Sequence, residues 1–350
     1  MIVYNLVRLV SYILSGVLTL IAPVNLMLGV DHTPVTRAKE DCKLSFATVS
    51  DIHLRENFNL IFEGMLDLGL SDMENAEDRL DAVVFDGDIT NGGEIGQWDV
   101  FADALSRYDI ADNVFIVTGN HDTWGPYDED AGETWDDPEK GFKNTFIKYN
   151  KSITNRDITE MYYSDTVNGY TFIALGAEED HTWAFISDEQ IKWLDSELQK
   201  ASATGLPIFV FIHQPINETH GLPYNWELDE THPADKGGIG DQSASVVEVL
   251  KKYDNIFYVS GHIHAGFKNE DSKIGVDYAS VEYLENNNGN NITLINLPSY
   301  MYFDFLRGGH LANGCGWVVE AYENEVLIRA RNFGTGSWLP KYDVTVPIVK

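Results

Sequence analysis

The sequence predicts an α/β protein, and two observations support this prediction. Short apolar runs rich in valine, isoleucine and phenylalanine alternate with segments of helical periodicity, which is typical of stacked α/β units. In addition, 44% of the 350 residues are hydrophobic and 12% are aromatic, so the chain can bury a sizeable core in one large domain or in two. Disorder is therefore excluded for the bulk of the chain.

The predicted elements alternate between strands and helices over most of the chain. Strands are expected at residues 44–49, 82–85, 113–117, 170–175, 208–212 and 256–259. Helices are expected at residues 58–70, 96–106, 188–201 and 242–252. The dipeptide Asn168-Gly169 predicts a tight hairpin between residues 162–166 and the strand that begins at Tyr170.

The pattern changes after Gly266, where only short strands are predicted. They are expected at residues 276–281, 292–297, 316–322, 325–331 and 343–347. Such a run of strands is typical of a mostly antiparallel sheet. We therefore divide the chain into an N-terminal segment at 1–30, a catalytic core at 42–270, and C-terminal strands at 271–350 that complete a second sheet.

Residues 1–30 are interpreted as a targeting or anchoring segment outside the folded core. A single charged residue, Arg8, precedes an apolar stretch of about 20 residues, which is about long enough to span a bilayer. A signal peptide and an uncleaved membrane anchor both remain open, and Pro23 makes cleavage after Ala22 unfavourable. A buried core helix is the third alternative, disfavoured because the segment lacks a polar face. Either favoured interpretation predicts an extracytoplasmic protein, secreted or anchored at the cell surface.

Charge argues against nucleic acid as a partner, and cysteine spacing excludes a zinc finger. The chain carries 55 acidic and 24 basic residues, a formal net charge of -31, and such a surface repels the phosphate backbone of nucleic acids. The two cysteines, Cys42 and Cys315, lack the Cys-x-x-Cys spacing of a zinc finger. In an exported protein they could form a disulfide, and two separate buried thiols are the alternative.

The residues that can carry chemistry are concentrated where predicted strands end, which is where ligands bind in open α/β sheets. In chain order they are Asp51 and His53, then Asp88, then Asn120, His121 and Asp122, then His213, and finally His262 and His264. Carboxylate, imidazole and amide donors without thiolates suit manganese, iron or zinc. The sequence therefore predicts a metal site at this edge of the sheet.

The spacing of these residues predicts two ions. Alternate residues leaving a strand project to the same side, so Asp51 and His53 can bind one ion together, and His262 and His264 repeat this geometry. The carboxylate of Asp88 can bridge two cations. Two ions about 3.5–4 Å apart lower the pKa of a shared water and clamp the attacking and leaving oxygens of a phosphoryl group. We therefore expect a two-metal phosphoesterase.

The ordered motifs resemble those of the calcineurin-like metallophosphoesterase superfamily. They are Asp51-Ile52-His53, Gly87-Asp88-Ile89-Thr90-Asn91, Gly119-Asn120-His121-Asp122, His213 and Gly261-His262-Ile263-His264. The resemblance implies a four-layer α/β/β/α sandwich with two central mixed β-sheets. It also implies one ion held by Asp51, His53, Asp88 and His264, and a second held by Asp88, Asn120, His213 and His262.

The same resemblance implies a reaction. A metal-bridging hydroxide would attack the phosphorus in line, and His121, oriented by Asp122, would protonate the leaving oxygen. Each motif alone is a common accident, whereas five in this order are specific. A surface homologue that keeps the fold and binds without turnover is the alternative class.

Departures within the motifs favour one branch of the superfamily. Asn91 and Gly92 stand where the protein Ser/Thr phosphatases carry Asp-Arg, and Asn91 also replaces a tyrosine of purple acid phosphatases. Asp122 stands where the nucleotidases carry glutamate. The chain is most similar to the bacterial cyclic-nucleotide phosphodiesterase-like branch, which implies small phosphodiesters as substrates. A phosphomonoesterase acting on nucleotides or sugar phosphates is the alternative.

Two insertions are expected to determine the substrate. They span residues 123–142, with Trp124, and 216–240, with Tyr224 and Trp226. Aromatic side chains there could stack on a nucleobase or a sugar, and ordinary packing within the loops is the alternative. The first insertion is also acidic, which argues against a nuclease that binds a long polyanion.

Overall fold

The computed structural model describes residues 31–55, 60–125, 133–134, 137, 141–179, 182–222, 237–267, 279–301 and 313–350. The segment at 1–30, most of the two insertions and half of the strand expected at 276–281 lie outside these ranges. Among the described residues, no helix is both long and apolar enough to span a membrane.

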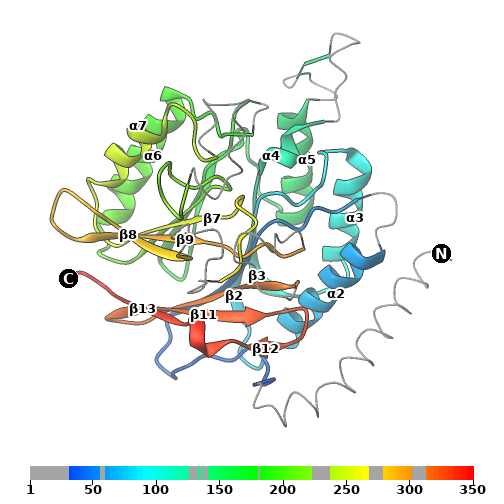
Figure 1. Cartoon of the computed structure of the whole chain (residues 1–350), viewed down its shortest axis with the longest axis horizontal. Coiled ribbons are helices and arrows are strands. Elements are labelled where there is room, and N and C mark those ends of the chain that lie inside the picture. Colours follow the sequence, from blue (N-terminus) through cyan, green and yellow to red (C-terminus); the bar gives the residue numbers. More distant parts are fainter. Residues whose placement is uncertain are drawn as a thin grey trace.

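Two β-sheets pack face to face (Figure 1). The first contains β1 (Leu44–Val49), β2 (Leu80–Asp86), β3 (Ala111–Val117), β10 (Cys315–Ala321), β11 (Glu325–Asn332), β12 (Ser337–Trp338) and β13 (Val344–Pro347), in the order β12-β11-β10-β1-β2-β3 with β13 beside β11. The second contains β4 (Tyr163–Val167), β5 (Tyr170–Ala174), β6 (Ile208–Phe211), β7 (Ile256–Ser260), β8 (Val281–Glu285) and β9 (Asn291–Asn296), in the order β4-β5-β6-β7-β9-β8.

Helices form the two outer layers. On the side of the first sheet lie α2 (Leu60–Glu74), α3 (Ile95–Leu105), the short α4 (Asn120–Thr123) and α5 (Phe142–Thr154) (Figure 1). On the side of the second sheet lie α6 (Asp188–Ser202) and α7 (Ser243–Leu250). Both sheets are mixed, because β10 runs antiparallel to β1 and β4 runs antiparallel to β5 while the central strands are parallel. The predicted four-layer α/β/β/α sandwich is confirmed.

The core between the sheets is aromatic. Phe46 of β1 contacts Phe172 of β5 and Phe209 of β6 edge to face, with ring centroids 5.0 and 4.8 Å apart. Successive residues of a strand point to opposite faces, so Val210 instead joins Leu194 of α6 in the core between the second sheet and its helices. The same alternation of side chains determines which residues beyond the strand ends face the space between the two sheets.

The structure differs from the predicted elements at α5 and in the C-terminal strands, and it also contains the short α4 and β12, which were not predicted. Helix α5 was not expected, because its sequence is rich in asparagine, serine and threonine, which are weak helix formers. The C-terminal strands were expected to complete the second sheet, and that prediction is wrong for most of them. Only β8 and β9 join the second sheet, whereas β10 to β13 extend the first. Pairing β10 with β1 covers an edge that would otherwise be exposed.

The two cysteines lie far apart and form no disulfide with each other. Leu44 of β1 pairs with Ala321, and Thr48 pairs with Trp317, so Cys42 and Cys315 lie beyond opposite ends of this ladder. At about 3.3 Å per residue the separation is roughly 20 Å, whereas a disulfide requires Cα atoms within about 7 Å. The alternative of two separate thiols holds, and the disulfide is excluded.

Candidate metal centre

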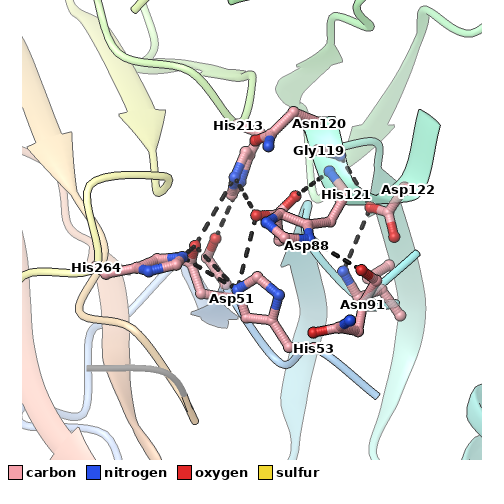
Figure 2. A network of polar contacts seen from close by, with 12 residues as sticks. Asp51, His53, Asp88, Asn91, Gly119, Asn120, His121, Asp122, His213 and His264 are labelled. Carbon is pink, nitrogen blue, oxygen red and sulfur yellow. Dashed lines mark hydrogen bonds and ion pairs between the residues drawn. The ribbon is translucent and has the colours of Figure 1, made fainter. Parts of the chain in front are cut away.

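Strand ends from both sheets meet at one edge of the sandwich (Figure 2). The loops after β1, β2 and β3 contribute Asp51, His53, Asp88 and Asn120, and the loops after β6 and β7 contribute His213, His262 and His264. All seven are buried except His264, whose side chain is 15% exposed. The structure therefore brings together residues that span more than two hundred positions of the chain.

Four of these side chains form the first group of potential ligands. The nearest donor atoms of Asp51, His53, Asp88 and His264 all lie within 4.8 Å of one another. The Nε2 atoms of His53 and His264 are 3.1 Å apart, and His264 Nε2 is 3.2 Å from Asp51 Oδ1. His53 Nε2 lies 3.7 Å from Asp88 Oδ2. This spacing suits a single ion bound between the four residues.

Asp88 also belongs to a second group. Donor atoms of Asp88, His213 and His262 lie within 4.8 Å of one another, and His213 Nε2 is 3.1 Å from Asp88 Oδ2. Asn120 is buried, and its Oδ1 accepts no hydrogen bond from the described residues. Figure 2 shows its side chain directed toward the same cluster. The Oδ2 atom of Asp88 thus faces both groups, which is the position of a bridging ligand.

The backbone at the predicted ligands adopts an unfavourable conformation. Ten non-glycine residues in the described part of the chain have a positive φ, and five of them are ligand candidates: Asp51 (59°), His53 (51°), Asp88 (49°), His262 (74°) and His264 (49°). Such a conformation costs about 1–3 kcal/mol per residue and persists where surrounding structure imposes it. Positive φ angles are concentrated at the ligand candidates, which indicates that the fold loses some local stability in order to direct these side chains inward.

Two glycines allow the loops to approach closely. A Cβ atom at Gly87 would lie 2.6 Å from the His213 ring, and Gly87 has a φ of 82°. A Cβ atom at Gly261 would lie 2.0 Å from the Ser50 hydroxyl and 2.8 Å from Asp51 Oδ2. Any larger residue at either position would separate the loops that carry the ligands.

Hydrogen bonds fix which atoms of two ligands face the centre. His213 donates from Nδ1 to the carbonyl of Asp86 at 2.8 Å, which directs Nε2 toward Asp88. Asp88 accepts the backbone N–H of His121 at its Oδ1 atom, at 2.9 Å, which leaves Oδ2 for the centre. His213 Nε2 and Asp88 Oδ2 are 3.1 Å apart, so they can share a proton or, once His213 is neutral, bind a metal ion together.

The electrostatics of the cluster agree with a cation site. Burial disfavours the charged form of His213, but the Asp88 and Asp51 carboxylates outweigh it and raise the pKa of His213 to about 10. Both oxygens of Asp51 and the Oδ2 atom of Asp88 are buried and accept no hydrogen bond from the described residues. Buried carboxylate oxygens are rarely left in this state, and metal ions satisfy them directly. The residues therefore fit a pair of metal ions.

His121 lies beside the first group, and its orientation differs from the expected one. Its ring contacts that of His53 edge to face, with centroids 4.6 Å apart, and its Nδ1 atom donates to the carbonyl of Asn91 at 2.9 Å. The expectation that Asp122 orients His121 is therefore wrong. A backbone carbonyl does so instead.

Asp122 holds the surrounding loops together. Its carboxylate accepts the backbone N–H groups of Thr90 at 2.8 Å, Gly119 at 2.9 Å and Ile89 at 3.3 Å, and the Thr90 hydroxyl at 2.7 Å. All of these groups are buried, so each needs a partner. Asp122 thereby joins the loop after β2 to the loop after β3.

The sequence did not reveal Gln97, which closes the same loop from the other side. Its side chain is 6% exposed, and its Oε1 atom accepts the backbone N–H groups of Asn91 at 2.9 Å and Gly92 at 2.8 Å. The peptide group between Asn91 and Gly92 therefore binds His121 through its carbonyl and Gln97 through its N–H. The sequence offers one signal for Gln97. It is a glutamine in the first turn of a helix, and that helix follows a loop that contains glycine.

Comparisons with known proteins agree with this geometry. A family model described as calcineurin-like phosphoesterase matches residues 44–266. A probable glycerophosphodiester phosphodiesterase GpdQ from Arcobacter nitrofigilis is 22% identical over 236 residues, which cover 65% of this chain and 69% of that protein. The glycerophosphodiester phosphodiesterase GpdQ of Enterobacter lignolyticus is 25% identical over 182 residues, which cover 48% of this chain and 56% of that protein.

Two solved structures share the fold. A dimetal phosphatase from Danio rerio superposes with a TM-score of 0.55 at 14% identity, over 88% of this chain and 100% of that one. A purple acid phosphatase from yellow lupin seeds superposes with a TM-score of 0.52 at 14% identity, over 87% of this chain and 53% of that one. Identities this low establish the common sandwich and nothing about substrate.

Proposed function

The chain belongs to the calcineurin-like phosphoesterase family, and on that premise we propose that it hydrolyses small phosphodiesters at its paired metal sites. The observation that carries the proposal is the position of Asp88, whose carboxylate is common to both groups of ligands. Diesters are favoured over monoesters because both relatives described above are named as phosphodiesterases. The strongly acidic chain favours a small substrate over a long polyanion.

In this proposal two sets of side chains hold the ions. Asp51, His53, Asp88 and His264 hold one, and Asp88, Asn120, His213 and His262 hold the other. When bound, two such ions lower the pKa of a water between them and neutralise charge on the phosphoryl oxygens. Manganese, iron and zinc all suit carboxylate, imidazole and amide donors.

His121 serves as the general acid. Because its Nδ1 atom is engaged with the Asn91 carbonyl, Nε2 is the ring atom that can donate a proton to the leaving oxygen. Contact with the His53 ring keeps this proton next to the first group of ligands. The carbonyl fixes the orientation of the ring, so no side-chain carboxylate is required for that purpose.

The proposal places the enzyme outside the cytoplasm, secreted or anchored through residues 1–30. Its support is the apolar run after Arg8, which is followed by a folded α/β core. Fractionation of cells that express the full chain should recover activity in the membrane or extracellular fraction. Activity confined to the soluble cytoplasmic fraction would contradict this part of the proposal.

Metal analysis combined with two chromogenic esters tests the function. Protein purified without chelator should contain two equivalents of transition metal and should hydrolyse bis-p-nitrophenyl phosphate faster than p-nitrophenyl phosphate. Chelation should abolish turnover, and added manganese should restore it. A faster monoester reaction would favour the phosphomonoesterase alternative. Metal-loaded protein that turns over neither ester would favour a surface protein that binds without catalysis.

A further inference from the structure

Trp124 lies directly against the general acid. The residue follows the end of α4, and its indole ring contacts the His121 ring with centroids 3.9 Å apart and planes at 43°. Despite this contact the side chain is 46% exposed. Most tryptophans bury the large apolar surface of the ring, so much of this ring is available to another molecule.

The backbone around Trp124 is closely packed. A Cβ atom at Gly93, which has a φ of 70°, would lie 2.4 Å from the carbonyl oxygen of Gly125 and 2.7 Å from that of Asp122. The residues on both sides of Trp124 therefore pack against the loop that orients His121. This backbone packing places the indole at a defined position beside the reacting groups.

In-line displacement determines which part of a substrate would meet this ring. The leaving oxygen departs on the side opposite the attacking water and takes its proton from His121. A leaving oxygen hydrogen-bonded to Nε2 of His121 lies within about 8 Å of the indole centre, given the ring contact and an ordinary hydrogen-bond length. The atoms attached to that oxygen can then reach the exposed surface of Trp124.

We propose that Trp124 forms a leaving-group subsite that selects phosphodiesters whose leaving group carries a planar ring, such as a nucleoside. This inference rests on the proposed phosphodiesterase function and assigns its substrate class. A planar ring buries the exposed indole surface by stacking, whereas glycerol would place hydroxyl groups against it and lose their hydrogen bonds to water. Stacking of one base on an aromatic side chain contributes about tenfold or more to binding.

Three diesters distinguish two possible roles of Trp124: a subsite that binds the leaving group, and a support that only positions His121. Bis-p-nitrophenyl phosphate has a planar leaving group that departs without a proton. Thymidylyl-3′,5′-thymidine has a leaving group that carries a planar ring and needs a proton, and glycerophosphoglycerol has a non-planar one that also needs a proton. Loss of a stacking surface raises KM for the first two esters. Loss of support for the acid lowers kcat for the last two.

The experiment measures KM and kcat of metal-loaded wild type, Trp124→Ala and Trp124→Phe with all three esters. We expect Trp124→Ala to raise KM about tenfold for the two planar esters, to leave the KM of glycerophosphoglycerol within about twofold, and to leave all kcat values nearly unchanged. Trp124→Phe should recover part of the loss. Tyr283→Ala is the matched control, because Tyr283 is 50% exposed and pairs with Thr293 of β9, which in turn pairs with Phe257 near the end of β7 opposite to the centre.

Three results would overturn the inference. One is a fall in kcat for the two esters that need a proton, with KM unchanged, which would make Trp124 a positioning residue for His121. Another is an equal effect, or none, on all three esters. The third is a wild-type enzyme that hydrolyses glycerophosphoglycerol and not the dinucleotide. If the metal-loaded wild type hydrolyses no ester at all, the proposed function itself fails and the subsite fails with it.

Discussion

The loop after β2 and the loop after β5 are closed in the same way, but only the first carries side chains of the metal centre. Gln97 is the third residue of α3 and Gln190 the third residue of α6. Both are buried. At its Oε1 atom Gln97 accepts two backbone N–H groups of the preceding loop, and Gln190 accepts one. Each also donates from Nε2 to a nearby glutamate.

The two loops differ in what they hold. Gln190 bonds both the N–H and the carbonyl of Gly176, at 3.0 and 2.9 Å, and no predicted ligand lies in that loop. Gln97 holds the loop that contains Asp88, with its φ of 49°, and Asn91, which orients His121. Closing a buried loop is thus a requirement of the fold, since backbone groups need partners there. Of the two loops closed by a glutamine, only the one after β2 also carries a metal-ligand candidate.

Removing the ligand from the first loop should have the largest effect. Asp88→Asn replaces the carboxylate shared by both groups with a weaker neutral ligand. We expect loss of both metal equivalents and a fall in kcat/KM of about 10³-fold or more, because paired ions supply several kcal/mol of transition-state stabilisation. Elemental analysis and the bis-p-nitrophenyl phosphate assay measure these effects. A variant that keeps two equivalents and full activity would refute the bridging role.

Removing the residue that the loop orients should rank second. His121→Ala should keep both metal equivalents, because the Nδ1 atom of His121 bonds the Asn91 carbonyl and its ring lies outside the two ligand groups. With glycerophosphoglycerol we expect kcat to fall by about 10²–10⁴-fold, the usual contribution of a general acid. The loss should be much smaller with bis-p-nitrophenyl phosphate. Equal losses on both esters would contradict proton donation by His121.

Opening the first loop without touching the centre should have a third, smaller effect. Gln97→Ala removes the acceptor of two N–H groups and allows the Asn91 carbonyl to move away from His121. We expect about a tenfold loss of kcat with glycerophosphoglycerol, as found for groups that orient another residue, a smaller loss with bis-p-nitrophenyl phosphate, and unchanged metal content. A loss that is independent of the leaving group would mean that Gln97 serves stability alone.

The sequence predicts the ligands better than the residues that position them. Asp51, Asp88 and His213 stand out because few residue types bind metals and because they follow strands directly. The partner of His121 could not be predicted, since it is a main-chain carbonyl and every residue has one. The same limit explains why Asp122, a plausible carboxylate partner, was assigned the wrong contact.

The sequence did not predict which sheet the C-terminal strands join, and the reason is different. The nearly continuous apolar run of β10 predicts a strand with two buried faces, but it carries no information about which sheet the strand joins. Only the global arrangement, in which β1 needs a second neighbour, decides that. The local pattern thus predicted the fold class and the edge that holds the site, while the distribution of the C-terminal strands required the structure.

The second loop supplies the smallest predicted change in activity. Gln190→Ala removes hydrogen bonds to buried groups of Gly176, so the free energy of unfolding should fall by about 1–3 kcal/mol. No ligand candidate lies in that loop, so metal content should be unchanged, and kcat/KM should stay near the wild-type value for both aryl and glycerol esters. Urea unfolding and the same pair of assays measure the two quantities. If Gln190→Ala changed the ratio of the two rates as Gln97→Ala does, the orientation of His121 would depend on the whole sandwich rather than on its own loop.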